Sequence, residues 1–282
     1  MRRKVWLAGI CLFVVLLIWL IWESVSLQVT KYQVSSENLP KAFDGYRIVQ
    51  VSDFHNHRYG ADNAGLLEEI KKLRPDIIAV TGDVITNSRD LKTDNTPNFL
   101  RRLTAIAPVY YVPGNHEAWT PEYPRLERQM RDAGIHVLRN EKVVLQKGTD
   151  TIELLGVDDP AFAEESFADD AAAMDAALQK LCDGSHCRIL LSHRPELFDQ
   201  YAAHNIDLVF SGHAHGGQFR LPGIGGLYAP NQGIFPKYSG GLYRKGNTQM
   251  VVSRGLGNGF FPIRIGNRLE LVFVTLHTEN GR

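Results

Sequence analysis

Five short apolar segments, each followed at once by polar residues that include Asp, Asn or His, constrain the fold of this chain more than any other feature. The segments are residues 46–51, 76–81, 109–112, 188–191 and 208–210. The clusters that follow them are Asp53-Phe54-His55, Gly82-Asp83, Gly114-Asn115-His116-Glu117, Ser192-His193 and Gly212-His213-Ala214-His215. In α/β proteins, ligands bind at the carboxyl ends of the strands. If all five segments are strands, the clusters meet along one edge of the sheet and form one site.

The patterns between these segments predict an α/β fold. Leu and Ile recur at helical spacing in residues 61–73, with Glu and Lys on the other face, which predicts a helix between two of the strands. A strand, a helix and a strand in this order make a βαβ unit with a parallel sheet. Further helices are predicted at 99–106, 124–133 and 169–181. Further strands are predicted at 27–34, 248–253 and 269–276, with a strand–turn–strand pattern at 143–157.

The five clusters together supply two aspartates, one asparagine and five histidines. A mixed imidazole and carboxylate set suits Zn, Mn, Fe or Ni rather than Ca or Mg alone. Eight polar groups exceed what one tetrahedral ion needs, which indicates two metal ions. Each residue alone would more often be a cap, a turn residue or a surface histidine. Their presence together after five strands favours a metal site.

The motif order DxH, GDx, GNHE, SH and GHxH resembles that of the calcineurin-like metallophosphoesterase superfamily. The resemblance covers the chain from about Arg47 to the end. The N-terminal apolar stretch and the segment NLPKAFDGYRIVQVSDFHN are similar to the membrane-associated bacterial branch, some members of which cleave the pyrophosphate of UDP-diacylglucosamine. The resemblance implies a central β-sandwich flanked by helices, an αββα arrangement.

The resemblance also implies a role for each motif residue. The first metal would be held by Asp53, His55, Asp83 and His215, and the second by Asp83, Asn115, His193 and His213, with Asp83 bridging. His116 would face the substrate and either donate a proton to the leaving oxygen or stabilise the phosphate charge. Two divalent ions about 3.5–4 Å apart lower the pKa of a shared water, and the hydroxide attacks phosphorus. Glu117 is expected to orient His116 or a ligand.

The N-terminus carries a membrane signal. Residues 5–22 are apolar and contain no charge, and about 20 apolar residues span a bilayer. Arg2, Arg3 and Lys4 precede this run, so the positive-inside rule predicts a cytoplasmic N-terminus and an extracytoplasmic catalytic domain. The expected organisation is a membrane anchor at 1–26 and a metallophosphoesterase domain at 27–282. A signal peptide cleaved after Ser26 and a twin-arginine export signal are the open alternatives.

Three cysteines leave the redox state open. Cys11 lies inside the apolar run, while Cys182 and Cys187 flank the sequence DGSH. The pair could form a disulfide in an oxidising compartment, remain as two free thiols, or bind a metal with His186. The metal alternative lacks the second ligand pair that a closed zinc site needs.

Charge and motif completeness narrow the function. Lys plus Arg equals Asp plus Glu at 31 each, which argues against a nuclease or another basic nucleic-acid binder. The motifs are common to phosphomonoesterases, phosphodiesterases and pyrophosphatases, so the partner is a phosphorylated small molecule or a lipid-linked substrate. The alternative is a non-catalytic, membrane-anchored protein that binds a phosphate ligand on the same fold. Retention of every motif, His116 included, favours the hydrolase. Arg254 and Arg264 are expected to be solvated, with a phosphate contact as the second option. The sequence does not give the oligomeric state.

Overall fold

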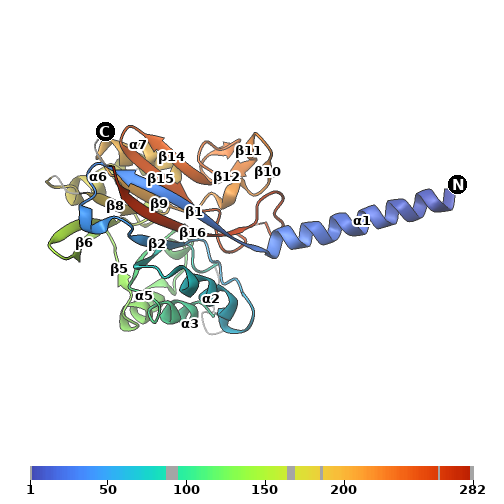
Figure 1. Cartoon of the computed structure of the whole chain (residues 1–282), viewed down its shortest axis with the longest axis horizontal. Helices are drawn as coiled ribbons and strands as arrows, with labels where there is room; N and C mark the ends of the chain where they lie inside the picture. The colour runs from blue at the N-terminus through green and yellow to red at the C-terminus, as the bar shows by residue number, and fades with distance from the viewer. Residues whose placement is uncertain (1, 87–94, 164–168, 185–186, 260, 280–282) are drawn as a thin grey trace.

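The structure, a computed structural model, describes residues 2–86, 95–163, 169–184, 187–259 and 261–279. Two six-stranded sheets pack face to face and helices cover both outer faces (Figure 1). This confirms the αββα architecture. The first sheet has the order β1 (Leu27–Ser36), β16 (Leu269–Thr278), β2 (Arg47–Val51), β3 (Ile77–Thr81), β4 (Val109–Val112) and β5 (His136–Val137). The second has the order β14 (Gly241–Lys245), β15 (Thr248–Val252), β9 (Leu208–Ser211), β8 (Arg188–Leu191), β7 (Asp150–Gly156) and β6 (Glu141–Lys147).

The strands that precede the polar clusters run parallel within their sheets. In the first sheet β2, β3 and β4 are parallel neighbours, and in the second β8 and β9 are. The clusters therefore come from two sheets, three from one and two from the other. The expectation that a single sheet edge would carry all five is wrong, because the sandwich brings the carboxyl ends of both sheets to the same place.

The helices pack by their apolar faces on the outer sides of the sheets. The first sheet is covered by α2 (Ala64–Leu73), α3 (Thr96–Leu103) and α5 (Tyr123–Asp132), and the second by α6 (Asp170–Leu181) and α7 (Phe198–Ala203). Asp169 caps α6, since its side chain accepts a hydrogen bond from the Ala171 N–H. The shorter elements are α4 (Asn115–Ala118), the 3₁₀ turns Lys41–Phe43, Ala61–Asn63, Pro160–Phe162, Pro195–Leu197 and His215–Gly217, and the strands β10 (Arg220–Leu221), β11 (Gly225–Gly226), β12 (Tyr228–Ala229) and β13 (Gly233–Ile234).

The protein has one hydrophobic core between the two sheets and one between each sheet and its helices. Alternation along β2 shows how a strand contributes to two of them. Ile48 belongs to the core between the two sheets, whereas Val49 and Val51 pack toward the helices. Successive side chains of a strand point to opposite faces, so a strand covered on both faces is apolar throughout. This is why the five motif strands read as continuous apolar runs in the sequence.

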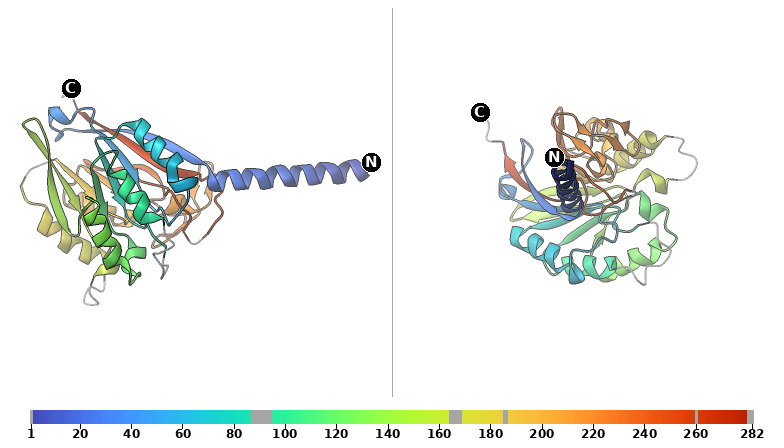
Figure 2. Two further views of the ribbon diagram at one scale, coloured as in Figure 1. Left: turned by 90° about the horizontal axis from the view of Figure 1, so that it is seen from below. Right: turned by 90° about the vertical axis from the view of Figure 1, so that its right-hand side faces the viewer.

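The N-terminal helix α1 (Arg2–Val25) projects away from the sandwich (Figures 1 and 2). Residues 3–25 are long and apolar enough to cross a membrane. At its end the chain passes directly into β1, which pairs in parallel with β16 from Leu27 to Ser36. The segment next to α1 is thus an edge strand of the first sheet, and only Ser26 separates the two.

Candidate metal centre

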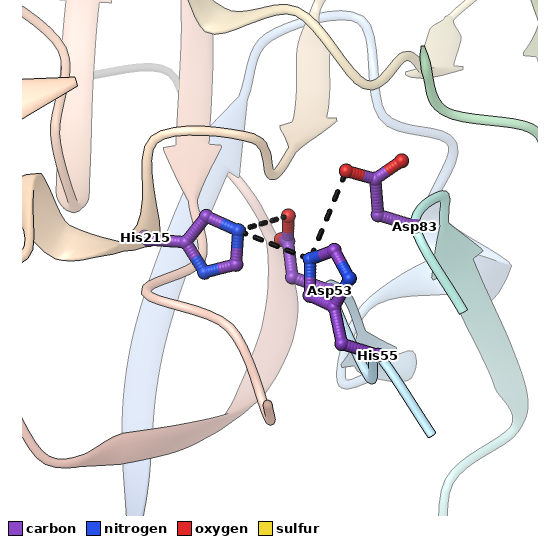
Figure 3. A group of neighbouring side chains, drawn as sticks. All are labelled: Asp53, His55, Asp83 and His215. Carbon is purple, nitrogen blue, oxygen red and sulfur yellow. Dashed lines mark hydrogen bonds and ion pairs between the residues drawn. The ribbon is translucent and has the colours of Figure 1, made fainter. Parts of the chain in front are cut away.

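The polar clusters after the motif strands converge at the carboxyl ends of β2, β3, β4, β8 and β9. Asp53, His55, Asp83 and His215 offer ligand atoms that lie within 4.8 Å of one another. Their side chains point toward a common centre (Figure 3). The Nε2 atoms of His55 and His215 are 3.1 Å apart, and His55 Nε2 is 3.8 Å from Asp83 Oδ2. His215 Nε2 lies 3.5 Å from Asp53 Oδ1. These four residues are the set expected for the first metal.

A second group is formed by Asp83, His193 and His213, whose ligand atoms also lie within 4.8 Å of one another. His193 Nε2 is 3.1 Å from Asp83 Oδ2, and His193 Nδ1 is 2.7 Å from the Thr81 carbonyl oxygen. A carbonyl only accepts, so Nδ1 carries the proton of that hydrogen bond and Nε2 faces the centre. Asp83 is the residue that the two groups share.

Asn115 is the fourth residue expected for the second metal. It is the first residue of α4 and is buried, and its Oδ1 has no hydrogen-bond partner within the described part of the chain. A Cβ added to the preceding Gly114 would lie 2.3 Å from Asp83 Oδ1, so this loop passes against Asp83 and only glycine fits there. A buried amide oxygen without a donor is costly unless something else binds it. The donor set and this orphaned oxygen fit a second metal ion.

The turns that carry the site are strained. Five non-glycine site residues have positive φ angles: Asp53 (50°), His55 (46°), Asp83 (50°), His213 (65°) and His215 (48°). Non-glycine residues rarely adopt this region, and each such residue costs of order 1–3 kcal/mol. Such strain persists where the surrounding structure over-determines it, and it gathers at functional sites.

The charges of the site favour metal binding at neutral pH. Burial lowers the pKa of His55 to about 4 and that of His213 to about 3, and it holds the pKa of His215 well below its usual range. These imidazoles are therefore neutral, which is the form that binds metals. Burial raises the pKa of Asp53 to about 6.

His193 and Asp83 form the charged pair at the centre. Burial alone would lower the pKa of His193, but the nearby Asp83 carboxylate outweighs it and raises the pKa to about 10. Burial alone would raise the pKa of Asp83, but His193 and His55 hold it well below its usual range. Protonated His193 thus supplies a positive charge among the carboxylates. A divalent cation would take over that role, and its binding would release the proton.

His116 lies at the rim of the site. Its backbone N–H donates to Asp83 Oδ1 over 2.9 Å, and its Nε2 is 4.0 Å from Asp83 Oδ2. Its ring packs edge-on against His55, and 26% of its side chain is exposed. Among the other histidines, His57 packs against Tyr59 and His136 stacks on Tyr110. His186 lies outside the described residues. His116 is thus the motif histidine that combines contact with the site and access from solvent.

Glu117 holds the two loops that carry Asp83 and Asn115. Its fully buried carboxylate accepts hydrogen bonds from the backbone N–H groups of Asp83 (2.8 Å), Gly114 (2.7 Å), Val84 (3.0 Å) and Ile85 (3.2 Å). Burial and the Asp83 charge raise the pKa of Glu117 to about 8. Four donors leave no acceptor for a carboxyl proton, so the geometry fits the ionised form. Glu117 was expected to orient His116 or a metal ligand, and in the structure it bonds the backbone N–H of Asp83, which is one of the candidate ligands.

We expect Glu117→Gln to destabilise the domain by about 3 kcal/mol, because the amide NH₂ would face two backbone donors and hydrogen bonds to charged groups contribute roughly 1.5–3 kcal/mol each. For a domain of this size, the melting temperature would fall by roughly 6–12 °C. Thermal unfolding of the two proteins measures this. The exposed Glu122→Gln variant is the matched control and should melt with the wild type. Equal melting of Glu117→Gln and wild type would show that the two hydrogen bonds lost with the second oxygen contribute nothing.

Three residues of the C-terminal region contact the candidate ligands His213 and His215, and the sequence did not predict these contacts. Asn231 Oδ1 lies 3.0 Å from His213 Nε2, and Asn267 Nδ2 donates to the His215 carbonyl over 2.8 Å. Arg264 is fully buried, and its Nη2 lies 3.4 Å from His215 Nδ1. The expectation of a solvated Arg264 is wrong, because its guanidinium bonds the carbonyls of Arg254 and Gly257.

Arg254 is likewise not solvated, since it pairs with Glu270 at 2.9 Å. The described cysteines belong to neither ligand group. Cys11 is exposed on α1, and Cys182 and Cys187 are free thiols in the structure, with residues 185–186 between them outside the described part.

Solved structures share the fold. The sulfate thiohydrolase SoxB of Thermus thermophilus superposes with a TM-score of 0.50 at 16% identity over 85% of this chain, which spans 58% of that longer protein. GAP50, the anchor in the inner membrane complex of Plasmodium, superposes with a TM-score of 0.50 at 13% identity, over 76% of this chain and 72% of that one. At such identities the likeness concerns the fold alone.

Curated relatives are closer in sequence. The uncharacterized metallophosphoesterase YkuE of Bacillus subtilis is 30% identical over 92% of this chain and 88% of its own length. The phosphodiesterase YaeI of Escherichia coli is 26% identical over 82% of each chain. The transmembrane protein with metallophosphoesterase domain of Bos taurus is 29% identical over 88% of this chain and 56% of its own length. The profile of the calcineurin-like phosphoesterases matches residues 46–217, more than half of the sequence, and includes all five clusters. The chain therefore belongs to the calcineurin-like phosphoesterase family.

Proposed function

We propose that this protein hydrolyses a phosphate ester or phosphoanhydride bond with two divalent metal ions. The observation that carries the proposal is the pair of ligand groups that share Asp83. In this assignment Asp53, His55, Asp83 and His215 hold one ion, and Asp83, Asn115, His193 and His213 hold the other. Two divalent ions there would activate a water and neutralise the phosphoryl oxygens. The imidazole and carboxylate donors favour Mn, Zn, Fe or Ni.

The remaining residues of the site act on the substrate and on the ligands. His116, exposed at the rim, is proposed to donate a proton to the leaving oxygen or to stabilise the phosphate charge. Glu117 keeps the Asp83 and Gly114 loops in register through its four hydrogen bonds. The Thr81 carbonyl fixes the ring orientation of His193. The phosphodiesterase YaeI among the relatives supports a phosphodiester as the first substrate to test.

The full chain, purified in detergent, tests the proposal when bound metal is counted and a phosphodiester, a phosphomonoester and a pyrophosphate are assayed in parallel. We expect two ions per chain and hydrolysis that is lost with a chelator and restored by Mn or Zn. A protein that carries two ions and cleaves none of the three would favour the non-catalytic, membrane-anchored phosphate-binding protein.

We further propose that residues 1–26 anchor the domain 27–282 on the outer face of the membrane. The cationic residues Arg2, Arg3 and Lys4 precede the span, whereas the nearest charges after it are Glu23 and Lys31. We expect protease added to intact spheroplasts to degrade the domain. Protection until the membrane is broken would reverse the orientation, and a soluble form that begins near Leu27 would indicate a cleaved signal.

A further inference from the structure

The end of α1 is hydrogen-bonded to the loop 261–268, and this loop in turn is hydrogen-bonded to the candidate metal ligand His215. The Asn267 N–H donates to Glu23 Oε2 and the Arg264 N–H donates to Ser24 Oγ, both over 3.0 Å. Asn267 Nδ2 in turn donates to the carbonyl oxygen of His215. Two hydrogen bonds therefore connect the last turn of α1 to the backbone of His215. The C-terminal end of α1 therefore lies close to the candidate metal centre.

The contacts at the end of α1 join residue types that are common at membrane interfaces. The Arg268 guanidinium lies over the Trp22 ring at 4.5 Å, and its Nε donates to Ser26 Oγ over 2.7 Å. Trp is enriched at the level of the lipid head groups, where its ring is partly apolar and partly polar. The loop 261–268 is thus placed at the depth of the head groups when the apolar part of α1 spans the bilayer.

An apolar pocket of about 520 Å³ opens beside His215 at this end of the molecule. It is lined mainly by His215, Phe219, Leu227, Tyr228, Pro230 and Phe261. Phe219 forms a bridge with Ile265, and Gln218 Nε2 donates to the carbonyls of Phe261 and Ile263. The pocket is therefore built between the β10–β13 region and the loop that contacts α1. A volume of this size is typical of small-molecule sites.

Exposed apolar side chains surround the pocket. Outside α1, the exposed large apolar residues of the described chain concentrate in residues 221–263, and the others are Trp119 and Val144. Of the exposed apolar residues in 221–263, Tyr228 and Phe261 line the pocket. The strands β10 to β12 lie at the end of the sandwich from which α1 projects, and beside α1 when it is viewed end-on (Figures 1 and 2). An apolar surface next to a membrane span is typical of contact with lipid.

We propose that this pocket binds an aliphatic chain of the substrate, so that the metal centre acts on a lipid whose phosphate lies at His215 and whose chain enters between Tyr228 and Phe261. The inference rests on the proposed hydrolase function and adds the substrate class and the residues that select it. A lipid fits because the pocket is apolar, reaches a candidate metal ligand and opens next to the anchor.

A series of p-nitrophenyl alkyl phosphodiesters with methyl, butyl and hexyl groups tests the pocket with the full chain in detergent. These esters share one leaving group and are monomeric in water, and KM is measured at two detergent concentrations so that partition into micelles is separated from binding to the pocket. Burial of one methylene contributes about 0.8 kcal/mol at most, which allows up to about a four-fold gain in binding. We expect kcat/KM to rise by about two- to four-fold per methylene, because KM falls while kcat stays the same.

Tyr228→Ser combined with Phe261→Ser should bring the hexyl-to-methyl ratio of kcat/KM close to one. Both side chains are about half exposed, so the fold should tolerate the change. Ile234→Ser with Phe235→Ser is the matched control, since these exposed apolar residues belong to the same region but do not line the pocket. The control should keep the wild-type ratio.

Two results would overturn the proposal while leaving the hydrolase intact. One is a wild type that cleaves the methyl ester and gains nothing from longer chains. The other is a control variant that loses the ratio as completely as the pocket variant, because the effect would then come from the apolar surface as a whole. A wild type that holds two metal ions and cleaves no ester would overturn the proposed function, and the pocket assignment with it.

Discussion

Replacement of Asp83 by Asn is expected to lower hydrolysis by several orders of magnitude. Asp83 is the residue common to both ligand groups, so the change weakens both candidate metal positions at once. Metal ions contribute several kcal/mol of transition-state stabilisation, and each 1.36 kcal/mol is a factor of ten in rate, which gives roughly 10³-fold or more. The nearly isosteric Asn can still accept the His116 N–H at its side-chain oxygen, so the loops should keep their arrangement.

The measurement pairs kcat/KM for a phosphodiester with the number of metal ions bound per chain. Asp175→Asn, at an exposed aspartate that pairs with His204, is the matched control and should retain wild-type activity. We expect the Asp83 variant to bind fewer ions and to lose rate even at saturating Mn or Zn. Near-normal turnover with both ions bound would remove Asp83 from the shared position.

Much of the fold, and the grouping of the site residues, could be predicted from the positions at which the apolar strands end. The predicted strand 109–112 is β4 without change, and 188–191 is β8. Each candidate metal ligand follows the end of such a strand by two to four positions. Parallel strands present their carboxyl ends together, which explains why the clusters after β2, β3 and β4 meet and why those after β8 and β9 meet. The face-to-face packing of the two sheets, which strand patterns alone do not predict, brings the two sets together. Local apolar patterning was sufficient for this part because both faces of each motif strand are buried.

The backbone conformation of the site and its C-terminal neighbours could not be predicted in this way. Asp53, Asp83 and His213 adopt left-handed φ angles that the surrounding packing imposes, and no local pattern marks them. Asn267 reaches His215 across 52 positions of sequence, and Glu23 reaches Asn267 across 244. Such contacts depend on the pairing of β1 with β16, which brings the two ends of the chain together. A single sequence carries no signal for that pairing.

His116→Ala is expected to leave both metal positions intact and to lower kcat by roughly 10²–10⁴-fold for a phosphodiester with an alkoxide leaving group. His116 belongs to neither ligand group, and its Nε2 is 4.0 Å from Asp83 Oδ2 at the exposed rim. The expected loss comes from the proton that the leaving oxygen needs. The backbone N–H that bonds Asp83 Oδ1 is retained in the alanine variant, so the Asp83 carboxylate should keep its position.

The leaving group separates the two roles considered for His116. A p-nitrophenolate leaves without a proton, so a pure acid would be nearly dispensable for a p-nitrophenyl ester and essential for an alkyl ester. A group that stabilises the phosphate charge would be needed equally for both. The ratio of wild-type to variant kcat for the two esters therefore distinguishes proton donation from charge stabilisation. His204→Ala is the control, since His204 caps the end of α7 and pairs with Asp175 of α6, and it should change neither rate. If the His116 variant is purified without metal, His116 is a ligand and both roles are wrong.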